Sequence, residues 1–213
     1  MIAKTLLAAA SAAALLTGVA NAATVYATDI DWENNGTVGG NNDRDDETNA
    51  LGAPDGDFLA LGLSSLDGTN PGFAVFSFGG QTFGGGDVTA YEVTFNCTVR
   101  QDGSCTYPES LAVYYGTDYA FGSHDFGDLA DFSLAGEIFN ADAQGGASLV
   151  IPGSFTYIAL VDTTLTNFPG SPSTDGFDID AVGVSAVPVP GAAALIVPGL
   201  IAGGLARRKA KTA

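Results

Sequence analysis

Apolar and polar residues alternate along the middle of the chain with a period close to two. Glu92 separates Tyr91 from Val93, and residues 155–161 follow a similar pattern. Because successive side chains of a strand point to opposite faces of a sheet, this alternation predicts β-strands. Similar short apolar runs recur between clusters of Gly, Asp, Asn and Pro. The predicted strands cover residues 24–30, 57–63, 72–79, 91–95, 110–116, 147–153, 155–161 and 177–180.

These strands predict the fold class of the central segment, residues 23–186. Many short strands with dense turn signals, and no long amphipathic helix among them, are typical of an all-β antiparallel sandwich or jelly roll. The segment has about 164 residues and no internal repeat, which suits one domain that buries roughly 70% of its unfolded surface. We therefore expect a single β-sandwich between two differently composed ends.

The N-terminal end, residues 1–22, predicts a secretory signal peptide. Lys4 precedes an apolar run that ends at Val19, and the small residues Ala20 and Ala22 form a cleavage pattern. The alternative is a retained membrane anchor, which the shortness of the run disfavours.

The C-terminal end, residues 187–213, predicts a transmembrane helix followed by a basic tail. The uncharged run is about 20 residues long, enough at ~1.5 Å per residue to cross a ~30 Å hydrocarbon layer. Lysine and arginine beside a span prefer the cytoplasmic side, so we expect residues 23–186 to lie outside it. The basic residues that follow the run are Arg207, Arg208, Lys209 and Lys211.

Charge narrows the function classes for the central segment. It contains all 24 Asp and Glu of the chain against two basic residues, Arg44 and Arg100, a net charge of −22. Neutralising phosphates needs a basic surface, so nucleic-acid binding is excluded. Such acidity favours solubility, repels other polyanions and suits divalent cations.

Cys97 and Cys105 flank a Gln-Asp-Gly-Ser turn. In an exported chain, such a pair is well placed to form a disulfide across a hairpin. A catalytic thiol or a zinc site fits poorly, because His124 is the chain's one histidine.

Two acidic stretches are candidate cation sites. A loop with many turn-forming residues could bind Ca²⁺ through carboxylate oxygens, although its spacing is not that of an EF-hand, and the alternative is a solvated loop held by Asx turns. A strand carries two carboxylates ~6.5–7 Å apart, which could share a cation, act as a glycosidase acid and base, or simply form a polar outer face. The candidate ligands are Asp43, Asp45, Asp46 and Asp55 in the loop, and Asp178 and Asp180 on the strand.

Aromatic residues gather in the stretch VYYGTDYAFG, and flat rings of this kind bind the apolar faces of sugars. Tyr115 and Tyr119 are the candidate sugar-binding residues. Tyr114 and Tyr115 are adjacent, so they should point to opposite faces, with at least one in the core. His124, in the following loop, is expected to form a surface pair with Asp125.

The three-part C-terminal end resembles the PEP-CTERM sorting signal of Gram-negative bacteria. A proline motif, a small apolar helix and a basic cluster occur in the same order, although Val189 stands where the commonest form has glutamate. The resemblance implies transient anchoring in the inner membrane, processing by an exosortase, and transfer to the cell surface or matrix, often with exopolysaccharide. The alternative is a plain anchor; a GPI signal fits worse because it lacks the basic cluster. The motif residues are Val187, Pro188, Val189 and Pro190.

The order of motifs between residues 49 and 182, from NALGAPDGDFLALG to DGFDIDAV, is similar to an extracellular jelly-roll module related to galactose-binding-like domains. Such domains bind sugars or proteins and commonly hold a structural Ca²⁺, so the resemblance favours calcium as the cofactor.

Two function classes follow. The first is a non-catalytic exported surface or matrix protein that associates with exopolysaccharide, with calcium-dependent carbohydrate binding as its expected mode. The second is an exported carbohydrate-active enzyme that uses paired carboxylates. Since the sequence contains no nucleophile or metal-ligand motif, the first class is preferred.

Overall fold

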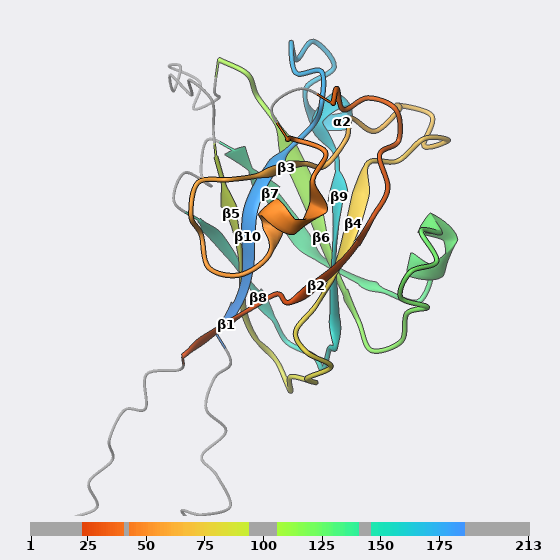
Figure 1. Ribbon diagram of the computed structural model, residues 1–213. Coiled ribbons are helices and arrows are strands. Elements are labelled where there is room, and N and C mark those ends of the chain that lie inside the picture. Colours follow the sequence, from red (N-terminus) through yellow and green to blue (C-terminus); the bar gives the residue numbers. More distant parts are fainter. Residues whose placement is uncertain (1–22, 41–42, 94–105, 141–145, 186–213) are drawn as a thin grey trace, which may run out of the picture.

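The computed structural model describes residues 23–40, 43–93, 106–140 and 146–185, which form two antiparallel sheets packed face to face (Figure 1). The predicted all-β sandwich is confirmed at this level. The predicted signal and transmembrane helices, the sorting motif and the cysteine pair lie outside these ranges. Within them, no helix combines the length and apolar composition needed to cross a bilayer.

The first sheet has the strand order β1-β10-β5-β8, with β3 also pairing with β10. Its strands are β1 (Thr24–Tyr26), β3 (Leu59–Ala60), β5 (Gly86–Glu92), β8 (Ala147–Ile151) and β10 (Asp178–Ser185). The second sheet has the order β2-β4-β9-β6-β7. Its strands are β2 (Asp29–Trp32), β4 (Phe73–Ser77), β6 (Ser110–Gly116), β7 (Ser133–Phe139) and β9 (Tyr157–Asp162). The connections include the short helices η1 (Glu47–Ala50), η2 (Phe126–Leu129) and α2 (Thr164–Asn167).

The predicted strand 24–30 is in fact two strands in different sheets. The amide of Ala27 donates to the carbonyl of Val182 in the first sheet, and the next amide, Thr28, donates to Ser77 in the second. The chain thus crosses between the sheets at one peptide, and places β2 at an edge of the second sheet beside β4.

The central strands of the second sheet are apolar on both faces. On β4, Ala74 and Phe76 face the core between the sheets, whereas Phe73 and Val75 join a smaller cluster on the outer face. On β9, Leu160 and Ala159 divide in the same way. An outer sheet face is normally polar, so this one needs a cover.

Strand β7 was not predicted, and the reason lies in its position. It is an edge strand in which Ile138 is the only fully buried side chain, so its sequence shows no regular apolar alternation. The other regions of predicted strand overlap observed ones, although β5 begins at Gly86, before the alternation that predicted it.

The two ends of the folded domain lie side by side. Thr24 on β1 pairs with Ser185 on β10, and the chain enters and leaves at one end of the sandwich (Figure 1). Asp178 begins β10 and therefore lies about 23 Å away along the strand, at ~3.3 Å per residue.

Candidate functional site

The outer face of the second sheet is covered by residues 117–132, which we call the cover segment. Its residues Tyr119, Leu129 and Phe132 pack on the outer cluster of the sheet, which includes Val75 and Ala159. The segment contains η2 and projects from the side of the sandwich (Figure 1). An apolar sheet face is thereby buried by a loop instead of a helix.

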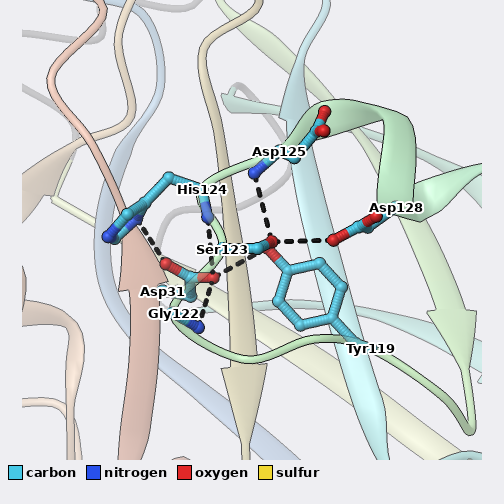
Figure 2. A network of polar contacts seen from close by, with 7 residues as sticks. All are labelled: Asp31, Tyr119, Gly122, Ser123, His124, Asp125 and Asp128. Carbon is cyan, nitrogen blue, oxygen red and sulfur yellow. Dashed lines mark hydrogen bonds and ion pairs between the residues drawn. The ribbon is translucent and has the colours of Figure 1, made fainter.

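The buried carboxyl group of Asp31 holds this segment in place (Figure 2). Asp31 lies on β2 opposite Val75, and only 2% of it is exposed. Its Oδ2 accepts hydrogen bonds from the hydroxyl of Tyr119 at 2.7 Å and the amide of Gly122 at 2.9 Å, with the amide of His124 further away at 3.4 Å. Three residues of the loop are therefore bound to one side chain through four contacts, once the ion pair described next is included.

His124 is the second member of this network. Its Nδ1 forms an ion pair with Oδ1 of Asp31, which has no other hydrogen-bond partner. The backbone of His124 has φ 52°, a left-handed conformation that is uncommon outside glycine and that tertiary contacts must hold. The predicted surface pair with Asp125 is wrong, because Asp125 instead accepts from the amide of Gly127 at 2.8 Å and caps η2.

Glu47 of η1 approaches the same network from another side. Burial raises the pKa of Glu47, the charge of His124 opposes the rise, and Asp31 adds to it. The network therefore contains groups from β2, η1 and the cover segment.

Two aromatic rings of the cover segment are presented to solvent above partly buried ones. Phe121 and Phe126 are each 40% exposed. The Phe121 ring stacks on Tyr157 with centroids 6.1 Å apart, and Phe126 meets the edge of Phe73 at 5.4 Å. A pocket of about 240 Å³ adjoins Phe126 and is lined by Tyr114, Phe126, Gly127, Leu129 and Ala130. Rings fixed from below in this way are suited to stacking on a flat apolar ligand.

The predicted sugar-binding tyrosines have other surroundings. Tyr115 packs against the core between the sheets and Tyr114 against the outer cluster, which confirms that the two point to opposite faces. Tyr119 is 7% exposed, and burial raises its pKa. It therefore packs edge-on against the exposed Phe121 ring, with centroids 6.2 Å apart, and offers little surface of its own.

A second group of buried acids lies near the start of β10, and we call it the acidic cluster. Asp178 is 6% exposed, and its Oδ1 has no hydrogen-bond partner. The guanidinium of Arg44 is close enough to interact electrostatically with Asp178 and forms an ion pair with Asp175. The acidic members are Glu92, Glu109, Asp162, Asp175 and Asp178.

These acids shift one another's titration. Burial raises the pKa of Asp178 to about 9, and the charges of Glu109 and Asp175 add to the effect. Burial likewise raises the pKa of Glu109 to about 8 and that of Asp162 to about 6. At neutral pH Asp178 and Glu109 therefore hold protons, and the charge of Arg44 offsets part of the charge that remains in the cluster.

Asp178 and Asp180 do not form the polar outer face or shared site considered from the sequence. Both are buried, and the register of β10 shifts between Ile179 and Ala181, so that Asp180 sits at a bulge. Asp180 accepts hydrogen bonds from the amides of Asp55 and Gly56, at 3.0 Å and 3.3 Å, and so holds the loop before β3. With neither carboxyl exposed to a polymer, this pair is poorly suited to glycosidase chemistry.

The loop carboxylates are also partly engaged by the chain itself. Asp46 caps η1 by accepting from the amide of Thr48 at 2.9 Å, and Asp55 accepts from the amide of Asp57 at 3.1 Å. Asp43, Asp46 and Asp57 line a polar pocket of about 180 Å³. In the described part of the chain, however, no three His, Cys, Asp or Glu side chains are arranged to hold one metal ion. Calcium binding through Asp43, Asp45, Asp46, Asp55, Asp178 and Asp180 does not fit this arrangement and stays a prediction.

Sequence reasoning missed Asp31, Arg44 and Glu109. Asp31 alternates with Ile30 and Trp32 and so looks like a solvent-facing residue of a half-buried strand. Its partner Tyr119 is 88 residues away, and no local pattern indicates such a contact. The one available signal was the isolated His124 in an acidic loop.

Comparison with known proteins leaves the chain without an assigned family. No protein-family model and no curated protein matches it. Among solved structures, it is similar to the C-terminal domain of a chitobiase from Bacteroides fragilis, with a TM-score of 0.41 and 10% identity, covering 79% of this chain and 95% of that one. A similarity at this level carries no functional argument.

Proposed function

We propose that this protein is a non-catalytic, exported cell-surface or matrix protein that binds polysaccharide through the cover segment. The observation that carries the proposal is the pair of exposed rings, Phe121 and Phe126, which pack on partly buried aromatic residues of the sheet in a loop that Asp31 fixes. A preorganised aromatic surface loses little conformational entropy when a sugar ring stacks on it. Exposed carboxylates in the same segment can accept hydrogen bonds from sugar hydroxyls.

The ends of the domain support export and sorting. Every described strand lies between Thr24 and Ser185, within the predicted central segment 23–186. Because these two residues are paired, the predicted signal-peptide junction and the predicted sorting motif emerge at the same end. A domain anchored there would extend the start of β10 away from the membrane.

Binding is tested with the full chain, purified from an exporting host, and the exopolysaccharide of that host. We expect co-sedimentation with the polymer, no release of oligosaccharides, and loss of binding in a Phe121→Ala/Phe126→Ala double variant. Val150→Ala is the matched control, because Val150 is an apolar residue of β8 that is 71% exposed. Equal binding by the double variant would exclude the cover segment, and shortening of the polymer would favour the enzyme alternative.

Sorting is tested by mass spectrometry of surface material. If an exosortase processes the tail, released protein should lack Lys211, and Pro188→Ala/Pro190→Ala should leave the chain bound to the membrane. Recovery of Lys211 in the released protein would show that the tail is retained.

A further inference from the structure

Two tyrosines from different strands meet on the outer face of the first sheet. Tyr26 lies on β1 and Tyr91 on β5, and β10 runs between these two strands. Neighbouring strands lie about 4.8 Å apart, so the backbones that carry the two tyrosines are roughly 10 Å apart. The ring centroids are nevertheless 6.1 Å apart, with the ring planes tilted by 50°. The two side chains therefore lean toward one another across β10.

Small residues of β10 make this approach possible. The core-facing valines of β10 alternate with Ala181 and Gly183, which point outward. Ala181 is the register partner of Tyr91, and Gly183 is that of Tyr26. A Cβ atom on Gly183 would lie 3.2 Å from the Tyr26 ring, closer than ordinary van der Waals contact. Glycine weakens a strand interior and often marks a close approach by another group, which here is the tyrosine ring.

The hydroxyl groups of the pair face one another. Burial raises the pKa of Tyr91, and a hydrogen bond between its hydroxyl and that of Tyr26 adds to the rise. The ring carbons next to the two hydroxyls are therefore also brought together. In o,o′-dityrosine, the product of oxidative coupling, these carbons are bonded and the two hydroxyls remain neighbours on twisted rings. Both tyrosines are partly exposed, so a small oxidant in solution can reach them.

Another tyrosine pair provides a contrast. The ring centroids of Tyr119 and Tyr157 are 5.9 Å apart, with the planes at 60°. The hydroxyl of Tyr119, however, donates to Asp31 at 2.7 Å, and Tyr119 is 7% exposed. Its phenolic hydrogen is thus held by a carboxyl group and shielded from solvent. Ring distance alone does not favour coupling, and the pair on the first sheet is better placed for it.

We propose that Tyr26 and Tyr91 are coupled into an intramolecular dityrosine by hydrogen peroxide and a peroxidase, which ties β1 covalently to β5. Each phenol gives up one hydrogen atom to the oxidant, and the ortho carbons of the two phenoxyl radicals form a C–C bond. Each bonded carbon then loses its hydrogen as a proton, and the phenol oxygen regains one. One hydrogen peroxide accepts the two hydrogen atoms and becomes two waters. The three-residue strand where the chain enters the domain is thereby fixed to the sheet.

The test treats the purified full chain, at low micromolar concentration, with a haem peroxidase and one equivalent of hydrogen peroxide. We expect a monomer that lacks the mass of two hydrogen atoms, fluoresces as dityrosine does, and yields on digestion a peptide pair joined through Tyr26 and Tyr91. Tyr26→Phe and Tyr91→Phe keep the rings but remove the hydroxyls, so each should reduce this fluorescence at least tenfold. Tyr157→Phe is the matched control and should leave it unchanged. Thermal melts verify that each variant folds.

The cross-linked monomer should also have a higher Tm than the untreated chain, by roughly 5 °C, because a covalent link restricts the unfolded state. An unchanged Tm would show that the link does not hold β1 and would overturn its structural role. Peptides joined mainly through Tyr157, or dimers as the main product, would overturn the assignment of the site. None of these outcomes depends on polysaccharide binding, which the co-sedimentation experiment tests separately.

Discussion

Asp31 and Asp178 are both buried carboxyl groups in a strongly acidic domain, but the groups that surround them are different. Asp31 is surrounded by donors from the cover segment: a hydroxyl, two amides and an imidazole. Asp178 lies among other acids, and its Oδ1 has no hydrogen-bond partner. Both oxygens of the first group face donors, whereas burial and neighbouring acids make the second more stable as the neutral acid.

The two residues therefore have different roles: Asp31 positions the cover segment, whereas the burial of Asp178 costs stability. Removing Asp31 leaves several donors without an acceptor and frees the loop that presents Phe121. Removing the charge of Asp178 removes repulsion with Glu109 and Asp175. The two sites should therefore respond differently to substitution by the neutral isostere.

The largest expected effect is a loss of stability with rising pH. In the unfolded chain these carboxyls ionise near pH 4, but in the folded chain the pKa of Asp178 is about 9 and that of Glu109 about 8. Between these values the folded state holds protons that the unfolded state has lost. The free energy of unfolding should therefore fall by about 1.4 kcal/mol per pH unit for each such group.

Urea unfolding at pH 5, 6, 7 and 8 measures this slope. Glu109→Gln should reduce it, because that position then carries no titrating proton. A free energy of unfolding that is constant or increases over this range would show that the acidic cluster is ionised in the folded state.

The second effect concerns Asp31. Asp31→Asn keeps one acceptor oxygen but replaces the other with an NH2 donor, so either the three donors at Oδ2 or the His124 imidazole loses its partner, and we expect a loss of about 3 kcal/mol. Asp87→Asn, at an exposed position of β5, should change the free energy of unfolding by less than ~0.5 kcal/mol. Chemical denaturation gives both values, and proteolysis within residues 117–132 reports whether the cover segment is released. A loss below ~1 kcal/mol with no new cleavage would mean that Asp31 does not hold the segment.

Asp178→Asn should change the free energy of unfolding less than Asp31→Asn at neutral pH. At alkaline pH it should increase this free energy. Near pH 7 the folded state carries the neutral acid, which asparagine resembles, so the change should be within ~1 kcal/mol. Above pH 9 the variant should be more stable than the wild type, because the wild type must then bury an additional charge. If the free energies of unfolding of the wild type and Asp178→Asn depend equally on pH, Asp178 does not differ from Asp31 in the way described.

The fold class could be predicted from sequence because strand periodicity is a local property. The alternation in residues 155–161 and the apolar run 72–79 identified β9 and β4. The division of residues 24–30 between two sheets could not be predicted, since it depends on Val182 and Ser77 as hydrogen-bond partners. Edge strand β7 was missed because few of its side chains are buried.

The candidate site was predicted only in part, because its geometry also depends on contacts between residues far apart in the sequence. The aromatic stretch was recognised, but which rings are exposed depends on how the cover segment folds over β4 and β9. The burial of Asp178 and Asp180 reflects the bulge in β10 and the loop at Asp55, neither of which alters the alternating pattern.

The smallest expected effect is that of calcium, and it bears on the acidic cluster directly. The sequence predicts calcium as the neutralising ion, whereas Arg44 and bound protons already offset part of the charge of the carboxyls near Asp178. Asp46, Asp55 and Asp180 accept hydrogen bonds from backbone amides. We therefore expect calcium and magnesium at equal ionic strength to raise Tm by the same amount, through screening of the net charge alone.

A rise specific to calcium and reversed by EDTA would instead indicate a bound ion, which at a hundredfold excess over Kd stabilises the folded state by about 2.7 kcal/mol. In that case, neutralising Asp178 should leave the rise unchanged if the ion lies in the loop beside Asp43, and abolish it if the ion lies in the acidic cluster.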